Sequence, residues 1–213
     1  GIPNAVAQFL AHKRDLGVHT EMICDSFVDL AEAGVITGRK KTLWKDKMIG
    51  AFALGSRRLY DWLDNNPGVE FHRGSVVNDP AVIAKNHKMV SINTTLQVDL
   101  FGQCVSEAIG HRQYSGCGGA IDTCVGAQRG GGKSIVALYS TAKNDTVSSI
   151  VAALAPGTPV TISRVDVDYV VTEYGVAHLR AANIRERVER LIGIAHPKFR
   201  PLLQEEAQKM ALW

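Results

Sequence analysis

The order of apolar and polar positions along the chain predicts short strands that alternate with helices. Apolar and polar residues alternate over Leu16–Met22 and Met89–Asp99, as in half-buried strands. Met48–Leu54 and Ser134–Tyr139 are nearly all apolar, which is typical of strands covered on both faces. Further strands are expected at residues 69–73, 160–163 and 169–172, and helices at residues 4–13, 25–33, 57–65, 81–86, 184–194 and 198–212. This alternation predicts an α/β fold, with a mostly parallel central sheet and helices on both faces.

Turn and cap residues mark the expected ends of these helices and strands. Asn4, after Pro3, is a plausible helix cap. Gly34 is expected to end a helix in the left-handed conformation, and Asn78-Asp79-Pro80 to begin one. Gly116–Gly132 holds seven glycines in seventeen residues, so a loop-rich segment is expected. Because no repeat or linker divides the chain, a single domain over residues 1–213 is expected.

Composition and charge exclude several classes of protein. With 213 residues, 46% hydrophobic and 21% charged, the chain is neither disordered nor a coiled coil. A net charge of +3 without a basic stripe indicates no nucleic-acid partner. No apolar run reaches the ~18 residues that cross a bilayer, so no membrane partner is expected. The four cysteines show neither a C-x-x-C pair nor zinc-like spacing, so we expect no metal, reduced thiols and a cytoplasmic location.

Two glycine-rich motifs invite a ligand interpretation. Ala127–Ser134 fits a relaxed phosphate-loop pattern, but a true phosphate loop is followed by a helix, and Ile135–Tyr139 is typical of a strand. A basic, glycine-rich hairpin is therefore predicted there. The second motif, Gly116-Cys117-Gly118-Gly119, leaves backbone N–H groups accessible and suits an oxyanion pocket. A tight turn is the alternative interpretation.

Two carboxylates stand at the ends of predicted strands, where α/β proteins place their sites. Glu21 follows His19 and Thr20, and Glu173 lies within Val171–Gly175. Each is weak evidence alone, because carboxylates at strand ends are often simply solvated. For His19, the histidine near Glu21, a hydrogen-bonded structural role is expected.

These residues and the motifs around them resemble the acetyl-CoA hydrolase/transferase family of class I CoA-transferases, and within it the 4-hydroxybutyrate CoA-transferase branch. The resemblance runs in order along essentially the whole chain, through Val18–Met22, Asp29–Thr37, Asn78–Pro80, Ile92–Thr94, Gln97–Leu100, Gly102-Gln103, Ser115–Gly119, Val167–Leu179 and Ala195–Arg200. It corresponds to the family's C-terminal, catalytic domain. It implies that an N-terminal domain, absent from this chain, adjoins it as a partner, and that the protein is a homo-oligomer.

The resemblance also implies a reaction and roles for particular residues. Members move CoA between carboxylic acids through a glutamyl-CoA thioester, and the nucleophile falls on Glu21. Acyl-CoA and a short-chain carboxylate are then substrates, and no cofactor is tightly bound. The oxyanion donor falls on the backbone N–H of Gly119, with Gly118 beside it, and a second carboxylate on Glu173. The residues that contact CoA or substrate fall on Asn78, Leu96, Ser115 and Gly119; some members have Asn where Ser115 stands.

The sequence leaves alternatives open. An acyl-CoA hydrolase of the same family would use water in place of the acceptor acid, and a non-catalytic CoA-binding or interaction module would not turn over at all. The acids are not identified, since one methylene is worth only ~1–3 kcal/mol of selectivity. A bare apolar wall toward the missing domain predicts that the chain alone self-associates or binds its other half. The nucleophile assignment further requires Glu21 to lie in a concave site with N–H groups of Gly118 or Gly119.

Overall fold

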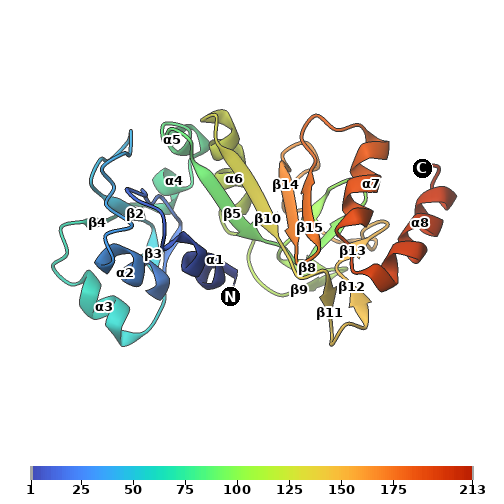
Figure 1. Cartoon of the computed structure of the whole chain (residues 1–213), viewed down its shortest axis with the longest axis horizontal. Helices are drawn as coiled ribbons and strands as arrows, with labels where there is room; N and C mark the ends of the chain where they lie inside the picture. Colours follow the sequence, from blue (N-terminus) through green and yellow to red (C-terminus); the bar gives the residue numbers. More distant parts are fainter. Residues whose placement is uncertain (1, 213) are drawn as a thin grey trace. The chain divides into compact units, whose positions relative to one another are not determined.

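A computed structural model describes residues 2–212 and shows two compact units (Figure 1). The first unit comprises residues 2–89 and 125–132, and the second comprises residues 90–124 and 133–212. One helix, α6 (Ala120–Arg129), contributes residues to both.

The first unit combines short helices with two-stranded parallel pairings. Strand β1 pairs with β3, and β2 pairs with β4, in both cases parallel. Its core gathers Ile23, Val28 and Leu59, each fully buried. The elements are α1 (Ile2–Leu10), β1 (Met22–Ile23), α2 (Asp25–Glu32), β2 (Met48–Gly50), β3 (Phe52–Ala53), α3 (Arg57–Leu63), β4 (Val69–Phe71), α4 (Gly74–Val77) and α5 (Pro80–Ile83).

Several helix ends of the first unit follow the predicted chemistry. Gly34, with φ of 70°, follows α2 in the left-handed conformation that glycine adopts without a steric penalty. The Asp79 side chain accepts a hydrogen bond from the Ala81 N–H at 2.8 Å and caps α5, whose first residue is Pro80. The prediction for Asn4 is wrong, because α1 already begins at Ile2.

The strand predictions for the first unit are only partly confirmed. Residues 16–22 form isolated bridges at Leu16 and His19 in place of a continuous strand. The run 48–54 splits into β2 and β3, which pair with different strands. Phe52 and Leu54 are 46% and 62% exposed, so the expected burial of this run holds only for β2. Short pairings with different partners leave the chain bent where a regular strand was expected.

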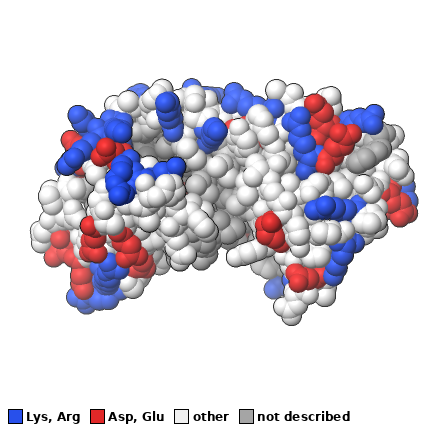
Figure 2. All heavy atoms as spheres, in the orientation of Figure 1, with Lys and Arg blue, Asp and Glu red and all other residues white. Residues whose placement is uncertain are grey.

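Ion pairs join α2 and α3 at the surface. Arg58 on α3 contacts Asp29 and Glu32 on α2, each at 2.6 Å. Figure 2 shows acidic and basic side chains gathered over these two helices. Since all three side chains are more than half exposed, the pairs add little to stability.

A four-stranded sheet organises the second unit. Its strand order is β15-β14-β10-β5, with β5 (Val90–Thr94), β10 (Lys133–Ala137) and β14 (Tyr169–Thr172) parallel and β15 (Gly175–His178) antiparallel at the edge. The other elements are β6 (Gln97–Asp99), β7 (Cys104–Val105), β8 (Ala108–Ile109), β9 (Arg112–Gln113), β11 (Thr141–Ala142), β12 (Val147–Ser148), β13 (Ile150–Val151), α7 (Ile184–Gly193), a 3₁₀ helix (Pro197–Phe199) and α8 (Arg200–Lys209). The predicted α/β class with mostly parallel pairing is confirmed.

One face of this sheet carries the core of the unit. Val136 and Val170 are fully buried on neighbouring strands and pack with Leu191 of α7. Side chains on the opposite face are less buried, and Val90 and Val176 are 49% and 62% exposed. The prediction of a strand at residues 160–163 is wrong, since that segment forms only a bridge from Ile162 to Cys104.

The glycine-rich segment is only partly the predicted loop, because residues 116–119 and 130–132 lie outside helices and strands. Residues 120–129 form α6, and Gly130–Gly132 then lead directly into β10. The predicted hairpin is therefore wrong. A Cβ atom on Gly126 would lie 2.5 Å from the Ile83 side chain, and one on Gly132 would lie 1.8 Å from the Met89 carbonyl. Gly126 and Gly132 therefore allow the chain to pack closely against Ile83 and Met89.

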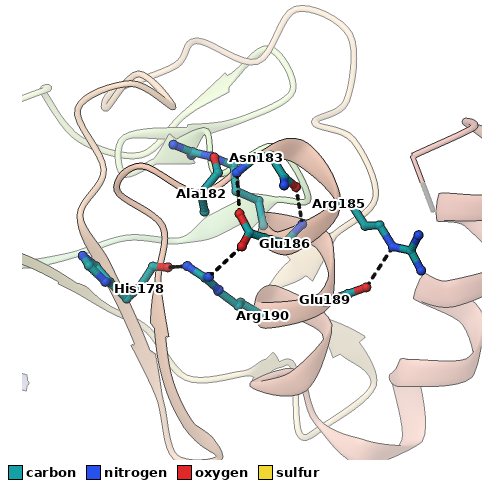
Figure 3. Close-up of polar contacts among 8 residues, drawn as sticks. His178, Ala182, Asn183, Arg185, Glu186, Glu189 and Arg190 are labelled. Carbon is teal, nitrogen blue, oxygen red and sulfur yellow. Dashed lines mark hydrogen bonds and ion pairs between the residues drawn. The ribbon is translucent and has the colours of Figure 1, made fainter.

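Helix α7 shows how local sequence fixes an element, as Figure 3 illustrates. Asn183 accepts a hydrogen bond from the Glu186 N–H, and the Glu186 carboxylate accepts one from the Asn183 N–H, which forms a capping box. Arg190 pairs with Glu186 one turn later and donates to the His178 carbonyl of β15. The predicted helix over residues 184–194 is confirmed to within one residue.

Among residues 2–212, no helix has both the length and the apolar character needed to cross a membrane.

Candidate active site

Glu21 lies in the bent segment of the first unit, directly before β1. Its main-chain carbonyl accepts hydrogen bonds from the N–H groups of Ala51 at 2.9 Å and Phe52 at 3.1 Å. The preceding Thr20 N–H bonds to the Ile49 carbonyl at 3.0 Å. These bonds fix the backbone of Glu21 against the break between β2 and β3. Its side chain is half-buried.

The structure brings Glu21 together with a second predicted site residue. Asn78 directly follows the short helix α4 and lies 57 positions after Glu21 in the chain. Its Nδ2 donates a hydrogen bond to Glu21 Oε2 at 3.1 Å. Asn78 is held there because α4 ends at Val77 and α5 begins at Pro80, which leaves a two-residue bend. The amide orients one oxygen of the Glu21 carboxylate.

His19 lies behind this pair and has the hydrogen-bonded role predicted for it. It is 6% exposed, and its Nε2 lies 2.7 Å from the Val77 carbonyl oxygen. Its Nδ1 lies 3.4 Å from Asn86 Nδ2. Burial lowers the pKa of His19, and the charges of Lys41 and His72 lower it further, although the bond to Val77 acts in the opposite direction. The imidazole is therefore neutral at pH 7 and cannot serve as a cation for substrate.

An aromatic stack beside His19 escaped the sequence analysis. The Trp44 ring stacks on His19 at 5.7 Å and on His72 at 4.9 Å. Trp44 has φ of +50°, which is unusual for a bulky residue. Nearby, Lys41 donates to the carbonyls of Val18 and Lys47, and burial lowers its pKa to about 8. Lys41, Trp44 and His72 lie more than 20 positions from His19 in the sequence, so only the fold reveals that they are close to it.

Two predicted residues of the second unit lie at the carboxyl edge of its parallel strands. Leu96 follows β5 and is 39% exposed, and Glu173 follows β14 in the tight turn to β15. Parallel strands present their carboxyl ends at one edge of a sheet, where α/β proteins bind ligands. Ser140 lies just beyond the end of β10, the strand next to β14, and it donates hydrogen bonds to Glu173. The ends of these two strands are therefore close together.

Ser140 holds the Glu173 carboxylate with two donors. The Ser140 N–H lies 3.0 Å from Oε2, and its hydroxyl lies 2.5 Å from Oε1. Partial burial raises the pKa of Glu173, but the bonds from Ser140, with the nearby His196, outweigh it and lower the pKa overall. Glu173 is thus an exposed, fixed anion at neutral pH.

The predicted oxyanion residues lie at the start of α6. Gly118 is exposed and has φ of +56°, and Gly119 is buried, with its carbonyl accepting the first helical bond from the Thr123 N–H. The N-terminus of a helix favours negative charge near its N–H groups. The Thr123 hydroxyl contacts Ser91 and Asn93 of β5. The helix start, one turn before Thr123, therefore lies toward the carboxyl end of β5.

Ser115 precedes this helix in an exposed loop. Its N–H bonds to the Glu107 carbonyl at 3.2 Å, and its hydroxyl donates to the Gly116 carbonyl at 3.1 Å. Within residues 2–212, no three histidine, cysteine or acidic side chains are grouped as metal ligands.

Comparisons with known proteins identify the family. The family model described as "Acetyl-CoA hydrolase/transferase C-terminal domain" matches residues 55–207. The chain is 51% identical over 211 residues to succinyl-CoA:cyclohexane-1-carboxylate CoA transferase of Geobacter metallireducens, covering 99% of this chain and 48% of that protein. It is 52% identical over 209 residues to 4-hydroxybutyrate coenzyme A transferase of Clostridium kluyveri, covering 98% and 49%. The chain thus spans about half the length of the curated relatives it matches.

Solved structures agree with this assignment. RipA from Yersinia pestis superposes with a TM-score of 0.95 at 42% identity, over 100% of this chain and 48% of that one. The 4-hydroxybutyrate CoA-transferase from Porphyromonas gingivalis superposes with a TM-score of 0.85 at 45% identity, over 99% and 49%. The chain therefore belongs to the acetyl-CoA hydrolase/transferase family and matches its C-terminal domain.

Proposed function

We propose that the protein containing this chain is a CoA-transferase that exchanges CoA between short-chain carboxylic acids through a thioester on Glu21. The observation that carries the proposal is the amide hydrogen bond from Asn78 to the half-buried Glu21 carboxylate. Relatives about half identical to this chain, described as CoA-transferases, support the reaction class. Acyl-CoA is then a substrate rather than a resident cofactor.

The first half of the reaction loads Glu21. A Glu21 carboxylate oxygen attacks the acyl-CoA carbonyl carbon. The C–S bond then breaks, CoA leaves as a thiolate, and the acyl group stays on Glu21 as a mixed anhydride. The thiolate then attacks the Glu21 carbonyl carbon and expels the acyl group as a carboxylate. Glu21 is left as its CoA thioester. Covalent catalysis of this kind divides a difficult exchange into easier steps.

The second half reverses these steps with a new acid. The incoming carboxylate attacks the Glu21 thioester, which releases CoA thiolate and forms a second anhydride. The thiolate attacks the new acyl carbonyl and restores the Glu21 carboxylate. In these steps the Asn78 amide orients the Glu21 carboxylate by its hydrogen bond to Oε2.

The tetrahedral intermediates of these steps need oxyanion donors. We assign this role to the Gly119 N–H with Gly118 beside it, because helix N-termini stabilise negative charge. Loss of one such donor typically costs about 3–4 kcal/mol of transition-state stabilisation. Glu173 supplies a second carboxylate, and Leu96 and Ser115 contact CoA. A second α/β domain completes the site, and the protein forms a homo-oligomer.

A hydrolase of the same family is the alternative, since acetyl-CoA hydrolases are also relatives. Those of Candida albicans and Yarrowia lipolytica are 30% identical to this chain, below the transferases. The test is to give the full-length protein acetyl-CoA and isotopically labelled butyrate. Transfer predicts labelled butyryl-CoA, formed at a rate that depends on butyrate. Thioester cleavage at the same rate without any acid would favour the hydrolase and contradict the proposal.

A further inference from the structure

His19 is tied to the segment that carries Asn78. Its imidazole Nε2 lies 2.7 Å from the carbonyl oxygen of Val77, the residue directly before Asn78. Asn78 in turn donates to the Glu21 carboxylate at 3.1 Å. Since Glu21 is two positions after His19, two contacts cross between the same two segments. This closed ring of contacts fixes the amide of Asn78 relative to the carboxylate.

The donors and acceptors define one state of the His19 ring. A carbonyl oxygen only accepts, so Nε2 carries the hydrogen toward Val77. Nδ1 of the neutral ring then accepts, and Asn86 Nδ2, at 3.4 Å, is the matching donor. Asn86 and His19 are each 6% exposed, so bulk water does not replace either contact.

Packing keeps the His19 ring in this orientation. Trp44 stacks on it with an interplanar angle of 24° and a centroid distance of 5.7 Å. The Trp44 ring also stacks on the His72 ring, with a centroid distance of 4.9 Å. A ring stacked on one face and bonded at both nitrogens has little freedom to rotate.

We infer that His19 is a positioning residue, which by holding the Val77 carbonyl sets the Asn78 amide that orients the Glu21 carboxylate. The inference rests on the proposed role of Glu21 as the nucleophile. The ring nitrogens of His19 contact Val77 and Asn86, and its proposed action is through the Asn78 amide. A nucleophile displaced by about 1 Å can lose about 10²-fold in rate, so removing the bond to Val77 is expected to slow attack by Glu21 to that extent.

Two substitutions separate the two bonds of the ring. In His19→Gln, the longer side chain places an amide N–H near the Nε2 position and retains a donor for Val77. In His19→Asn, the shorter side chain reaches only the Nδ1 position, where its oxygen accepts from Asn86, and the Val77 carbonyl loses its donor. His12→Asn, at an exposed histidine of the same unit, is the matched control.

The experiment measures the single-turnover rate at which the full-length protein forms the CoA adduct on Glu21. We expect His19→Asn to slow adduct formation by about 10²-fold, with KM for acyl-CoA unchanged and a cooperative melting transition retained. His19→Gln is expected to remain within about tenfold of the wild type, and His12→Asn to match it. In a His19→Asn/Asn78→Ala double variant, the rate should equal that of Asn78→Ala alone, because both act through one amide.

An undiminished rate in His19→Asn, or multiplied losses in the double variant, would overturn the inference and leave the proposed function standing. Absence of the adduct in the wild type would refute the proposed function, and this inference with it. Should His19→Asn fail to fold, the ¹⁵N resonances of the His19 ring in the wild-type protein decide. A neutral ring with hydrogen on Nε2 supports the inference, and hydrogen on Nδ1 contradicts it.

Discussion

The two units hold a glutamate beside a strand in different ways. In the second unit, Glu173 follows the regular strand β14 and is held by the main chain and hydroxyl of Ser140, its neighbour across the sheet. In the first unit, Glu21 precedes the two-residue strand β1 and accepts from the side chain of Asn78. Asn78 belongs to a segment that His19 contacts.

The difference separates a carboxylate held partly by a backbone N–H from one that accepts a hydrogen bond from a distant side chain. Glu173 is held partly by a backbone N–H that no substitution of Ser140 other than proline removes. Glu21 accepts a hydrogen bond from the side chain of Asn78, so substitution of Asn78 should change the geometry of its carboxylate. The irregular unit thus carries the carboxylate proposed to form and break bonds, and the regular sheet carries the carboxylate that stays an anion.

The largest expected difference between the two glutamates is in catalysis. Glu21→Gln removes the nucleophile and should lower kcat for CoA transfer by at least about 10³-fold while acyl-CoA still binds. Glu173→Gln keeps a polar side chain at the sheet edge and should lower kcat by about 10²-fold or less. Steady-state kinetics of the full-length variants measure kcat, and calorimetry measures the binding of acyl-CoA. Equal losses in the two variants would remove the distinction.

Shortening each side chain sharpens the same comparison. Glu21→Asp retains the charge but moves the carboxylate by over about 1 Å, so kcat should fall by about 10²-fold. Glu173→Asp should have a smaller effect, since a charge acts over a longer range than a forming bond. A rate for Glu21→Asp close to the wild-type rate would show that the position of this carboxylate is not critical.

Removing the hydroxyl that holds Glu173 should have a moderate, pH-dependent effect on stability. Ser140→Ala deletes the 2.5 Å hydrogen bond and should raise the pKa of Glu173 toward its usual value of 4.5. Because the pKa is lowered in the folded state, this bond stabilises the fold above pH 4.5, and the contribution is lost as Glu173 becomes protonated. Urea unfolding should show Ser140→Ala less stable at pH 7 by about 1–2 kcal/mol, and a smaller difference at pH 3.5. A difference independent of pH would exclude this linkage.

The smallest expected effect concerns protonation of His19. Burial lowers its pKa below 6.5, so the unfolded chain binds this proton more readily than the folded protein. Stability should therefore fall as the pH drops below 6.5, by at most about 1.4 kcal/mol per pH unit for one proton. Lys41 and His72 face the ring and add to the effect when charged. The stability of His19→Gln, which cannot titrate at this position, should depend less steeply on pH between 6.5 and 5.

The sequence predicted the regular parts of the fold better than the bent ones. The β-branched run at β14 and the amphipathic pattern of α7 give local signals, and both elements were predicted to within one residue. α6 was missed because the glycines within and around it indicate a loop, whereas the lack of a side chain on Gly126 lets it pack closely against Ile83. No local pattern could reveal that packing, because it depends on a partner 43 residues away.

The candidate site shows the same division. The family resemblance supplied Glu21 and Asn78, and the structure places them 3.1 Å apart. The contacts behind them were not predictable, since His19 meets Val77 across 58 positions of sequence. The stacking of Trp44 likewise depends on a left-handed backbone conformation that this residue type rarely adopts.

The most direct test of the central claim is mass spectrometry of the full-length protein after mixing with acyl-CoA and digestion with trypsin. Glu21 lies in the tryptic peptide from Asp15 to Arg39, which also contains Cys24. We predict a gain of the mass of CoA less one water, located on Glu21 by fragmentation, stable to a phosphine that reduces disulfides and absent in Glu21→Gln. An adduct on another carboxylate, one on Cys24 that the reductant removes, or no adduct during active turnover would contradict the account.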